Sequence, residues 1–353
     1  MSQSTVSRVL SGHPHVAEET RQRVLDIIST HHFVPNTLAR SLVTRRSRSI
    51  GLVVSNITNH FYPELIESIC TIAAEKSFSV ILCNTQQDPA LQKDSLRLLI
   101  EQRVAGIIMT SVVSTAPFAG ELVRDRFPLV LINRCLADVH SDAVLIDNHR
   151  GAFLAVMHFL KQGHRRIAFV GGLRNTTTSQ DRERGYLDAH AHANIPLDPA
   201  LTFDGDYSWA GGRRAADWFA AQQDRPTAAL CADDTTALGF IDGLAAMGIQ
   251  VPDDCAVIGF DDIREAAYQS ISLTTIRQPV AQMAELAMDL LERRLEGDVS
   301  PPQLIVLPAE LIVRRSSGGP RVANGVMEPN SAFQQRTYAP TLVGDRETER
   351  DSA

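Results

Sequence analysis

Short polar side chains recur directly after the apolar, strand-like runs of this chain. The set consists of Asn56, Asn59, Asn84, Ser111, Asn133, Arg134, Asp147, Asn148, Asp233, Asp234, Asp261 and Asp262. In parallel sheets covered by helices, ligands bind at the carboxyl ends of the strands. Each residue taken singly could equally cap the helix that follows it, because Asp, Asn and Ser oxygens accept hydrogen bonds from the first turn. As a set, they favour a polar cleft that binds a small molecule.

Aromatic residues and one arginine lie beside these polar positions. Phe61 and Tyr62 open an expected helix, and Tyr207 and Trp209 follow a pair of nearby carboxylates. Aromatic rings beside carboxylates suit stacking on a sugar or a purine, although such rings are also common in ordinary cores. Arg182 lies near the start of another expected helix, where a solvated surface charge is the alternative interpretation.

Catalytic and nucleotide-binding motifs are absent from the sequence. It contains no GxSxG, HExxH or GxxxxGK[ST], and the pair Gly171 and Gly172 lacks the third glycine of a dinucleotide-binding loop. The cysteines are Cys70, Cys83, Cys135, Cys231 and Cys255. They form no CxxC pair, which favours buried thiols over a metal site or disulfides. The sequence therefore predicts a binding protein that is not an enzyme and holds no metal or cofactor.

The N-terminal residues have the spacing of a DNA-reading helix. Over residues 2–10, short polar side chains and Arg8 fall on one face, and Val6 and Val9 fall on the other. Such donors can enter a major groove while the apolar face docks on its own domain. Residues 1–48 contain seven Arg and three acidic residues, a net charge of +4 against −11 for the remainder. This asymmetry indicates a polyanion partner at one end of the chain.

From residue 50 onward, short apolar strands alternate with amphipathic helices. Strands are expected at residues 50–54, 79–83, 106–109, 129–132, 143–146, 166–170, 228–232 and 255–260, and helices at 17–32, 61–77, 90–103, 148–162, 180–193, 209–222, 235–247 and 280–296. Extended runs are expected at 274–279, 304–307 and 310–313. Apolar strands separated by helices predict an α/β fold with parallel sheets covered on both faces, and this number of repeats favours two doubly wound lobes.

Seven motifs in register resemble the lactose-repressor (LacI/GalR) family of bacterial transcription regulators over residues 2–316. They are STVSRVL at 4–10, VPN at 34–36 with ARSL at 39–42, IGLVV at 50–54 with Asn59 and Phe61, GHRRIAFVGG at 163–172, RERGY at 182–186, VIGFDD at 257–262 and LTTIRQP at 273–279. The resemblance implies a small all-helical headpiece of helix-turn-helix type, a hinge helix, and two lobes of periplasmic-binding-protein type.

The resemblance also implies an organisation in domains. Residues 1–48 would form the headpiece and hinge helix, 49–147 with 278–308 the first lobe, and 148–277 with 309–316 the second lobe. Residues 317–353 are rich in Gly, Pro, Ser and charge, and we expect a disordered tail there.

Site residues follow from the resemblance by position. For DNA, it implies base contacts from Gln3, Ser4 and Arg8, contacts near phosphates or the groove edge from Thr5, Ser7, His15 and Asn36, and a minor-groove wedge at Leu42. For the effector, it implies contacts from Phe61, Asn133, Arg182, Tyr207, Asp234 and Asp261. An Arg and several Asp residues around an aromatic ring suit polyhydroxylated ligands.

The sequence departs from the family pattern at its start, where the first helix of the helix-turn-helix is missing. Val6, Val9 and Val24 would then lack partners, so we expect a poorly ordered headpiece and weak operator binding.

Two functions follow from these patterns. The first is a homodimeric, ligand-responsive repressor that reads a palindromic operator and responds to a sugar or sugar derivative. The alternative is a cytoplasmic small-molecule-binding protein that has lost DNA binding through truncation of the headpiece. Neither a signal peptide nor an apolar run of membrane-spanning length is present, so we expect a cytoplasmic protein without a membrane partner.

Overall fold

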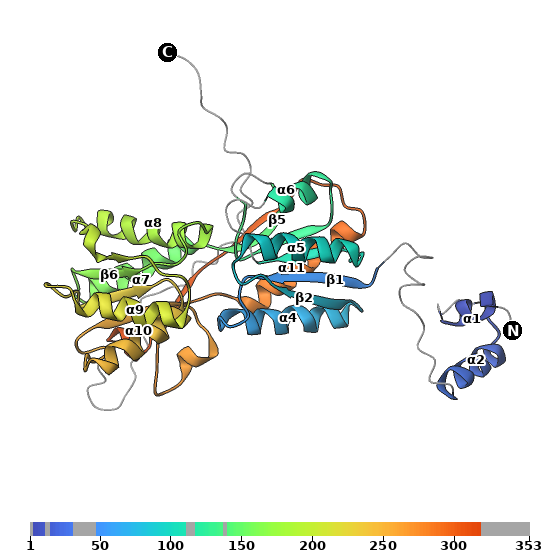
Figure 1. Ribbon diagram of the computed structural model, residues 1–353, viewed down its shortest axis with the longest axis horizontal. Helices are drawn as coiled ribbons and strands as arrows, with labels where there is room; N and C mark the ends of the chain where they lie inside the picture. Colours follow the sequence, from blue (N-terminus) through green and yellow to red (C-terminus); the bar gives the residue numbers. More distant parts are fainter. Residues whose placement is uncertain (1–2, 11–14, 31–46, 111–116, 137–139, 319–353) are drawn as a thin grey trace, which may run out of the picture. The chain divides into compact units, whose positions relative to one another are not determined.

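The computed structural model describes residues 3–10, 15–30, 47–110, 117–136 and 140–318 (Figure 1). The chain divides into two compact units, Met1–Ser47 and Arg48–Ala353. The expected hinge helix at residues 37–42, with Asn36 and Leu42, lies outside the described residues, as do Ser111 and the tail beyond residue 318.

The N-terminal unit has two helices within its described residues, α1 (Gln3–Leu10) and α2 (Glu18–Thr30). Both were expected, although α2 is shorter at each end than residues 17–32. The helices contact each other, and Val9 and Val24 are only 4% and 3% exposed. The expectation that these two side chains lack partners is therefore wrong, because each helix buries one of them within the unit.

The second unit contains two six-stranded sheets within its described residues, and each forms the centre of one lobe. The first sheet has the order β11-β5-β4-β3-β1-β2, and its neighbouring strands are all parallel. Its strands are β1 (Ser49–Val54), β2 (Ser79–Asn84), β3 (Ile107–Met109), β4 (Leu129–Ile132), β5 (Asp142–Ile146) and β11 (Leu304–Leu307).

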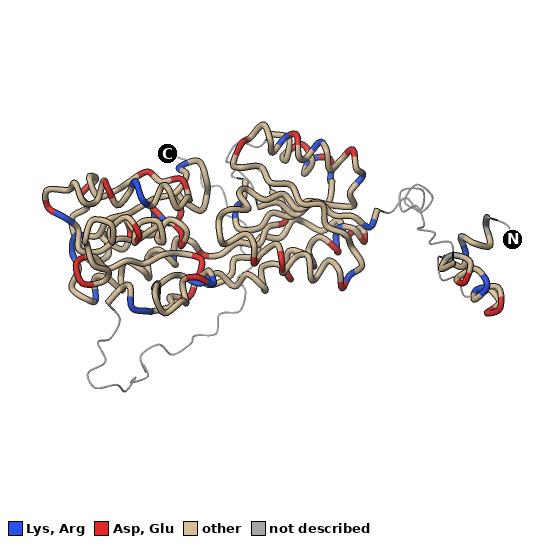
Figure 2. Tube along the Cα trace, turned by 60° about the horizontal axis from the view of Figure 1, so that its bottom comes forward, with Lys and Arg blue, Asp and Glu red and all other residues tan. Residues whose placement is uncertain are grey.

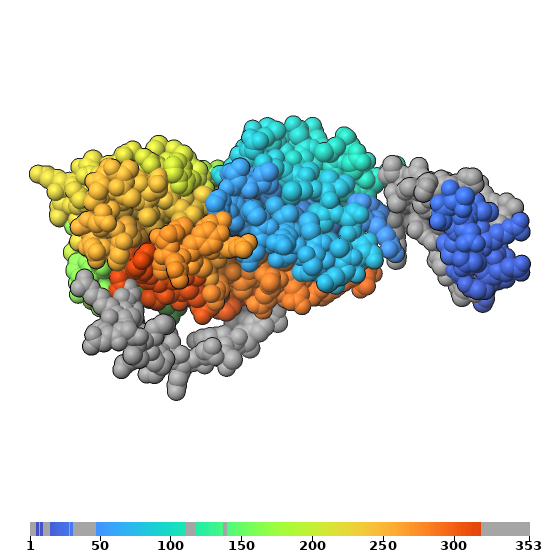
Figure 3. All heavy atoms as spheres, turned by 90° about the horizontal axis from the view of Figure 1, so that it is seen from below, coloured from blue at the N-terminus to red at the C-terminus, as the bar shows by residue number. Residues whose placement is uncertain are grey.

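Helices cover both faces of the first sheet. They are α4 (Phe61–Glu75), α5 (Pro89–Glu101), α6 (Pro117–Arg124) and α11 (Val280–Leu295). Side chains alternate between the two faces of a strand. In β1, Leu52 accordingly packs in the cluster with α4 and α11, and Val53 packs in the cluster with α5 and α6. Figure 3 shows the surfaces of α4, in blue, and α11, in orange, side by side.

The second sheet has the order β12-β10-β9-β8-β6-β7. Its strands are β6 (Ile167–Val170), β7 (Thr202–Phe203), β8 (Ala228–Cys231), β9 (Ala256–Asp261), β10 (Thr274–Arg277) and β12 (Glu310–Ile312). β12 runs antiparallel to β10, and the other pairs are parallel. Every residue of β9 is buried, as expected for a strand with helices on both faces.

Helices also cover both faces of the second sheet. They are α7 (Asn148–Lys161), α8 (Thr177–His192), α9 (Trp209–Ala220) and α10 (Asp234–Ala246), with short 3₁₀ turns η1 (Pro199–Leu201), η2 (Arg264–Ala267) and η3 (Arg315–Ser317). Phe169 of β6 packs among the residues of α7 and α8, and its neighbour Val170 packs with α9 and α10.

The chain crosses between the two sheets after β5, after β10 and after β11. These crossings connect the lobes, so residues far apart in sequence meet at the carboxyl ends of both sheets.

The structure contains one helix and one strand that the sequence did not predict. α6 has eight residues and β7 has two, and runs this short carry too little periodicity to be recognised. α8 begins three residues before the predicted position 180, since the Thr176 hydroxyl caps its first turn by accepting from the amide of Ser179.

A buried ion pair anchors the end of α11 to the first sheet. Arg294 Nε lies 2.6 Å from Asp142 Oδ2 and Nη2 lies 3.0 Å from Oδ1, and the Asp142 side chain is 4% exposed. Nη1 of Arg294 also donates to the carbonyls of Asp298 and Ser300. Asp142 additionally accepts from the backbone amide of Gln303, next to β11. One guanidinium therefore ties together α11, β5 and the approach to β11.

We predict that Arg294→Ala lowers the free energy of unfolding by about 3 kcal/mol, because it leaves the buried carboxylate of Asp142 unpaired. Arg293→Ala is the matched control, since Arg293 is 44% exposed and pairs at the surface with Asp298. Its loss should be below about 1 kcal/mol. Urea denaturation followed by circular dichroism measures both, and equal losses would contradict the proposed role of the Asp142 pair.

Candidate functional site

A polar cleft lies where the two lobes meet. It is lined by Ser55, Asn59, Phe61, Tyr62, Gln87, Asn133, Arg134, Thr178, Arg182, Tyr207, Asp233 and Asp261. These residues come from both lobes and mostly follow strand ends, as expected for parallel sheets. The empty volume, including the part that is open to solvent, is about 320 Å³. Ligand pockets range from roughly 300 to 1,000 Å³, so this cleft has the size for one small molecule.

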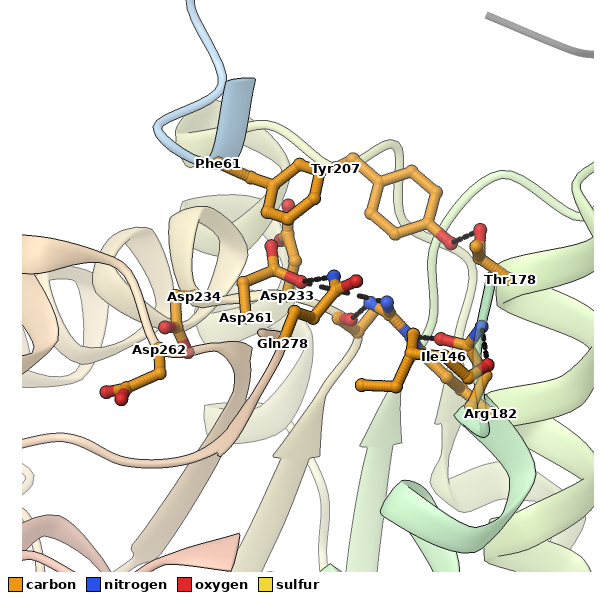
Figure 4. A network of polar contacts seen from close by, with 12 residues as sticks. Phe61, Ile146, Thr178, Arg182, Tyr207, Asp233, Asp234, Asp261, Asp262 and Gln278 are labelled. Carbon is orange, nitrogen blue, oxygen red and sulfur yellow. Dashed lines mark hydrogen bonds and ion pairs between the residues drawn. The ribbon is translucent and has the colours of Figure 1, made fainter. Parts of the chain in front are cut away.

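The structure brings five of the six residues considered for the effector into this cleft. They are Phe61, Asn133, Arg182, Tyr207 and Asp261. Figure 4 shows the rings of Phe61 and Tyr207 facing the space above the side chains of Asp261 and Arg182. Asn133, Tyr207 and Asp261 have φ values of 69°, 62° and 124°. Non-glycine residues rarely adopt such angles, and local strain of this kind gathers at binding sites.

Asp234, the sixth residue, does not line the cleft. Its side chain is fully buried, where Oδ1 accepts from the Thr275 hydroxyl at 2.6 Å and Oδ2 accepts from the Ile263 amide at 3.0 Å. The preceding residue, Asp233, faces the cleft instead. Asp233 caps α10 by accepting from the Thr236 amide at 2.8 Å, and its second oxygen accepts from Asn59 Nδ2 of the first lobe at 2.6 Å.

Arg182 forms part of the cleft floor, and several neighbouring groups fix the position of its guanidinium. Its Nε donates to Asn148 Oδ1 at 2.8 Å, and its Nη1 donates to the carbonyl of Ala232. Its Nη2 lies 3.7 Å from Asp261 Oδ1, and its guanidinium carbon lies 3.6 Å from the centre of the Phe260 ring. Only 3% of the side chain is exposed. The guanidinium is thus preorganised, and a ligand need not order it.

Asp261 is a carboxyl group whose charge is disfavoured by its surroundings. Burial raises its pKa well above the usual range, while Arg182 opposes that shift and the nearby Asp233 and Asp234 add to it. Gln278 Nε2 donates to Asp261 Oδ1 at 2.6 Å. A carboxyl in this environment can donate or accept a hydrogen bond, which suits recognition of hydroxyl groups.

Asn59 connects the two lobes across the cleft. Its Nδ2, in the loop after β1, donates to Asp233 Oδ2 at 2.6 Å and to the carbonyl of Tyr207 at 3.2 Å. Its Oδ1 accepts from the backbone amide of Phe61, which orients the side chain. The amide therefore holds the cleft closed while it positions an aromatic wall.

The second aromatic wall, Tyr207, depends on a glycine for its position. A Cβ atom at Gly172 would lie 2.1 Å from the Tyr207 ring, so only glycine fits beneath it. The hydroxyl of Tyr207 lies 3.0 Å from Thr178 Oγ1. Gly172, which follows β6, thus serves to pack a tyrosine.

Ser55, Gln87 and Thr178 line the cleft but were not singled out from the sequence. Ser55 directly follows β1 and could have been found by the same strand-end rule. Gln87 lies three residues beyond β2, and Thr178 lies in the first turn of α8, so no local signal marks them.

The residues considered for DNA contact lie in the N-terminal unit. Gln3, Ser4, Thr5, Ser7 and Arg8 belong to α1. Arg8 and His15 are exposed and Thr5 is half-buried, whereas the side chains of Gln3, Ser4 and Ser7 lie outside the described part. Figure 2 shows acidic and basic positions interspersed over this unit. On α1, the exposed Arg8 lies about 100° around the helix axis from the buried Val9, so its side chain can reach a partner while Val9 packs within the unit.

Within the described ranges, no cluster of His, Cys, Asp and Glu side chains has the arrangement of a metal site, and the cysteines are free thiols. In the same ranges, none of the helices combines the length and apolarity needed to span a membrane.

A helical unit with an exposed recognition-type helix, followed by two lobes around a polar cleft, defines a DNA-binding regulator controlled by a small molecule. Residues 1–36 match the family described as bacterial regulatory proteins, lacI family, and residues 156–317 match the periplasmic binding protein-like domain. The HTH-type transcriptional repressor PurR of Mannheimia succiniciproducens is 32% identical over 319 residues, which cover 90% of this chain and 95% of the relative. The chain belongs to the LacI family, and it is an effector-responsive transcriptional repressor.

Solved structures agree with this assignment. The lac repressor dimer bound to operator and the anti-inducer ONPF has a TM-score of 0.80 at 25% identity, covering 90% of this chain and 96% of that one. The transcriptional regulator CelR in complex with cellobiose has a TM-score of 0.71 at 28% identity, with the same coverage. The first of these proteins is a repressor and the second is a transcriptional regulator.

We predict a pH-dependent stability from Asp234. Burial raises its pKa to about 7, whereas an unfolded Asp titrates near ~3.9. Between these values the folded state keeps a proton that the unfolded chain has lost, so the wild-type protein loses stability as the pH rises. The free energy of unfolding of wild type should therefore fall relative to Asp234→Asn from about pH 4 to 7, and the difference should be constant above that.

Denaturation series at pH 5, 6, 7 and 8 measure this difference. Asp242→Asn is the control, because Asp242 lies on the same helix, is 51% exposed and pairs with Arg213. A difference between wild type and Asp234→Asn that does not change with pH would contradict the assignment.

We predict that Asn59→Asp opens the lobes, because it sets one carboxylate against another at hydrogen-bond distance. The lost donor should cost the closed arrangement about 2 kcal/mol. Pulsed electron–electron double resonance between one spin label on each lobe measures the distance between the lobes. This distance should be longer in Asn59→Asp than in the wild type. Asn56→Asp is the control, since the side-chain hydrogen bonds of Asn56 to the described residues are made by its oxygen, which accepts from Thr58. Unchanged distances in Asn59→Asp would refute the role of Asn59.

Proposed function

We propose that the cleft binds a sugar or sugar derivative as the effector of this repressor, and that the protein acts by binding and not by catalysis. The observation that carries the proposal is the gathering of Arg182, Asp233 and Asp261 beside Phe61 and Tyr207 in one site. Guanidinium and carboxyl groups make paired hydrogen bonds to neighbouring hydroxyls, and aromatic rings cover the apolar face of a sugar. The similarity to CelR, solved with cellobiose, supports the same class.

Ligand binding is coupled to the arrangement of the lobes. The first lobe supplies Phe61 and Asn133, and the second supplies Arg182, Tyr207 and Asp261. A molecule that contacts both sets binds best when the lobes are closed, and it shifts the equilibrium by that difference in affinity. We infer that this closure changes the affinity for operator DNA.

On DNA, the protein acts as a homodimer that reads a palindromic operator. In this proposal Gln3, Ser4 and Arg8 of α1 contact base edges, Thr5, Ser7, His15 and Asn36 lie near phosphates, and Leu42 enters the minor groove. The lac repressor, solved as a dimer on its operator, supports this arrangement.

Selection of DNA from a random pool by the full chain tests the proposal, and we expect a palindromic site. Arg8→Ala should weaken binding to that site by about 1–3 kcal/mol, because a base-edge contact is lost. Arg23→Ala is the matched control, since Arg23 is an exposed arginine on the neighbouring helix. Recovery of no preferred sequence, or equal losses in both variants, would contradict the assignment of α1.

A further inference from the structure

Arg134 is a buried cation at the cleft. Only 4% of the residue is exposed, and its Nε atom has no hydrogen-bond partner within the part of the chain that the structure describes. Its guanidinium carbon lies 5.4 Å from the centre of the Tyr207 ring, across the boundary between the lobes. Throughout the described ranges, no Asp or Glu forms an ion pair with it. A cation in this position needs an anion, because its desolvation is otherwise poorly compensated.

Other poorly exposed arginines of this protein are matched by carboxylates. Arg294 lies 2.6 Å from Asp142, and Arg314 Nη2 lies 2.6 Å from Asp262 Oδ1. Arg182 is paired with Asp261 at 3.7 Å and with two neutral acceptors. Arg134 differs from these arginines, and its charge can therefore pair with an anionic group of a ligand.

The carboxylates of the cleft are already engaged. Asp233 accepts from Asn59 and from the Thr236 amide, and Asp261 accepts from Gln278 and faces Arg182. Burial also raises the pKa of Asp261, which lowers the negative charge that an incoming anion would meet. Among the lining residues, Arg182 has a carboxyl group 3.7 Å away, whereas no carboxyl group of this set forms an ion pair with Arg134.

A second polar atom beside Arg134 is also without a partner. Asn133 Oδ1 is buried and accepts no hydrogen bond within the described residues. The neighbouring residues Asn133 and Arg134 thus present one acceptor and one charged donor at the same strand end, β4. A hydroxyl next to an anionic group on the ligand would satisfy both.

We propose that the effector is an anionic sugar derivative whose carboxylate or phosphate binds Arg134 and whose neighbouring hydroxyl donates to Asn133. This inference rests on the proposed carbohydrate function of the cleft. It narrows that function to sugar acids or sugar phosphates.

Isothermal titration calorimetry of the full chain tests the proposal with matched ligands. Glucuronate, glucose 6-phosphate and glucose form one set, and galacturonate, galactose 6-phosphate and galactose form another. We expect an anionic member to bind at least about tenfold tighter than its neutral counterpart, the gain expected of a charge-assisted hydrogen bond. The anion that binds identifies the group, carboxylate or phosphate.

Two variants locate the effect. Arg134→Gln should bring the affinity for the anionic ligand close to that for the neutral sugar, and Arg134→Lys should retain part of the difference. Arg174→Gln is the control, since Arg174 is 73% exposed, follows β6 and pairs with Asp204 at the surface. Circular dichroism and thermal melting establish that each variant is folded.

The outcomes separate this inference from the proposed function. Equal or tighter binding of the neutral sugars would overturn the role of Arg134 and leave the carbohydrate function intact. An anionic preference that survives in Arg134→Gln would also overturn it. Binding of neither neutral nor anionic sugars would overturn both proposals.

Discussion

The guanidinium of Arg182 is buried inside the second lobe, where the surrounding groups have to match its charge and its donors. Asn148 and the carbonyl of Ala232 accept from it, Asp261 lies 3.7 Å away, and the Phe260 ring lies against its face. Because these groups come from the start of α7, the end of β8 and the end of β9, one side chain of α8 ties several elements together. Displacing any of them would leave a buried donor unpaired, so the cleft floor depends on this arrangement.

Hydrogen bonds between the lobes cross the cleft, in addition to the apolar residues of both lobes that form one cluster. Asn59 donates to Asp233, and the His60 amide lies 3.3 Å from the Thr235 hydroxyl. Water can replace polar contacts of this type, whereas the apolar clusters around each sheet have no such substitute. Opening the cleft therefore costs much less than unfolding a lobe. A small molecule can then bias the lobes with a modest difference in affinity, which is the physical requirement for an effector-responsive repressor.

Much of the fold could be predicted because buried parallel strands are continuous apolar runs and the helices between them are amphipathic. These signals are local, and they located β1, β4 and α7 to within a residue or two. The two-residue β7 left no such signal, because its place is set by pairing with β6. Likewise, Gln87 and Thr178 reach the cleft only through the packing of their elements, and nothing in their sequence neighbourhood marks them.

The sequence by itself determined that polar residues follow the strands and that the chain resembles LacI regulators. Through that resemblance it also predicted Phe61, Arg182, Tyr207 and Asp261 as residues of one effector site. Only the tertiary structure decided which of two adjacent carboxylates faces the ligand space. Asp233 precedes the first residue of α10 and turns toward the cleft, while Asp234 begins the helix and points to Thr275 of β10. Successive side chains of a helix are rotated by about 100°, so the start of α10 and its packing against β10 separate the roles of two identical neighbours.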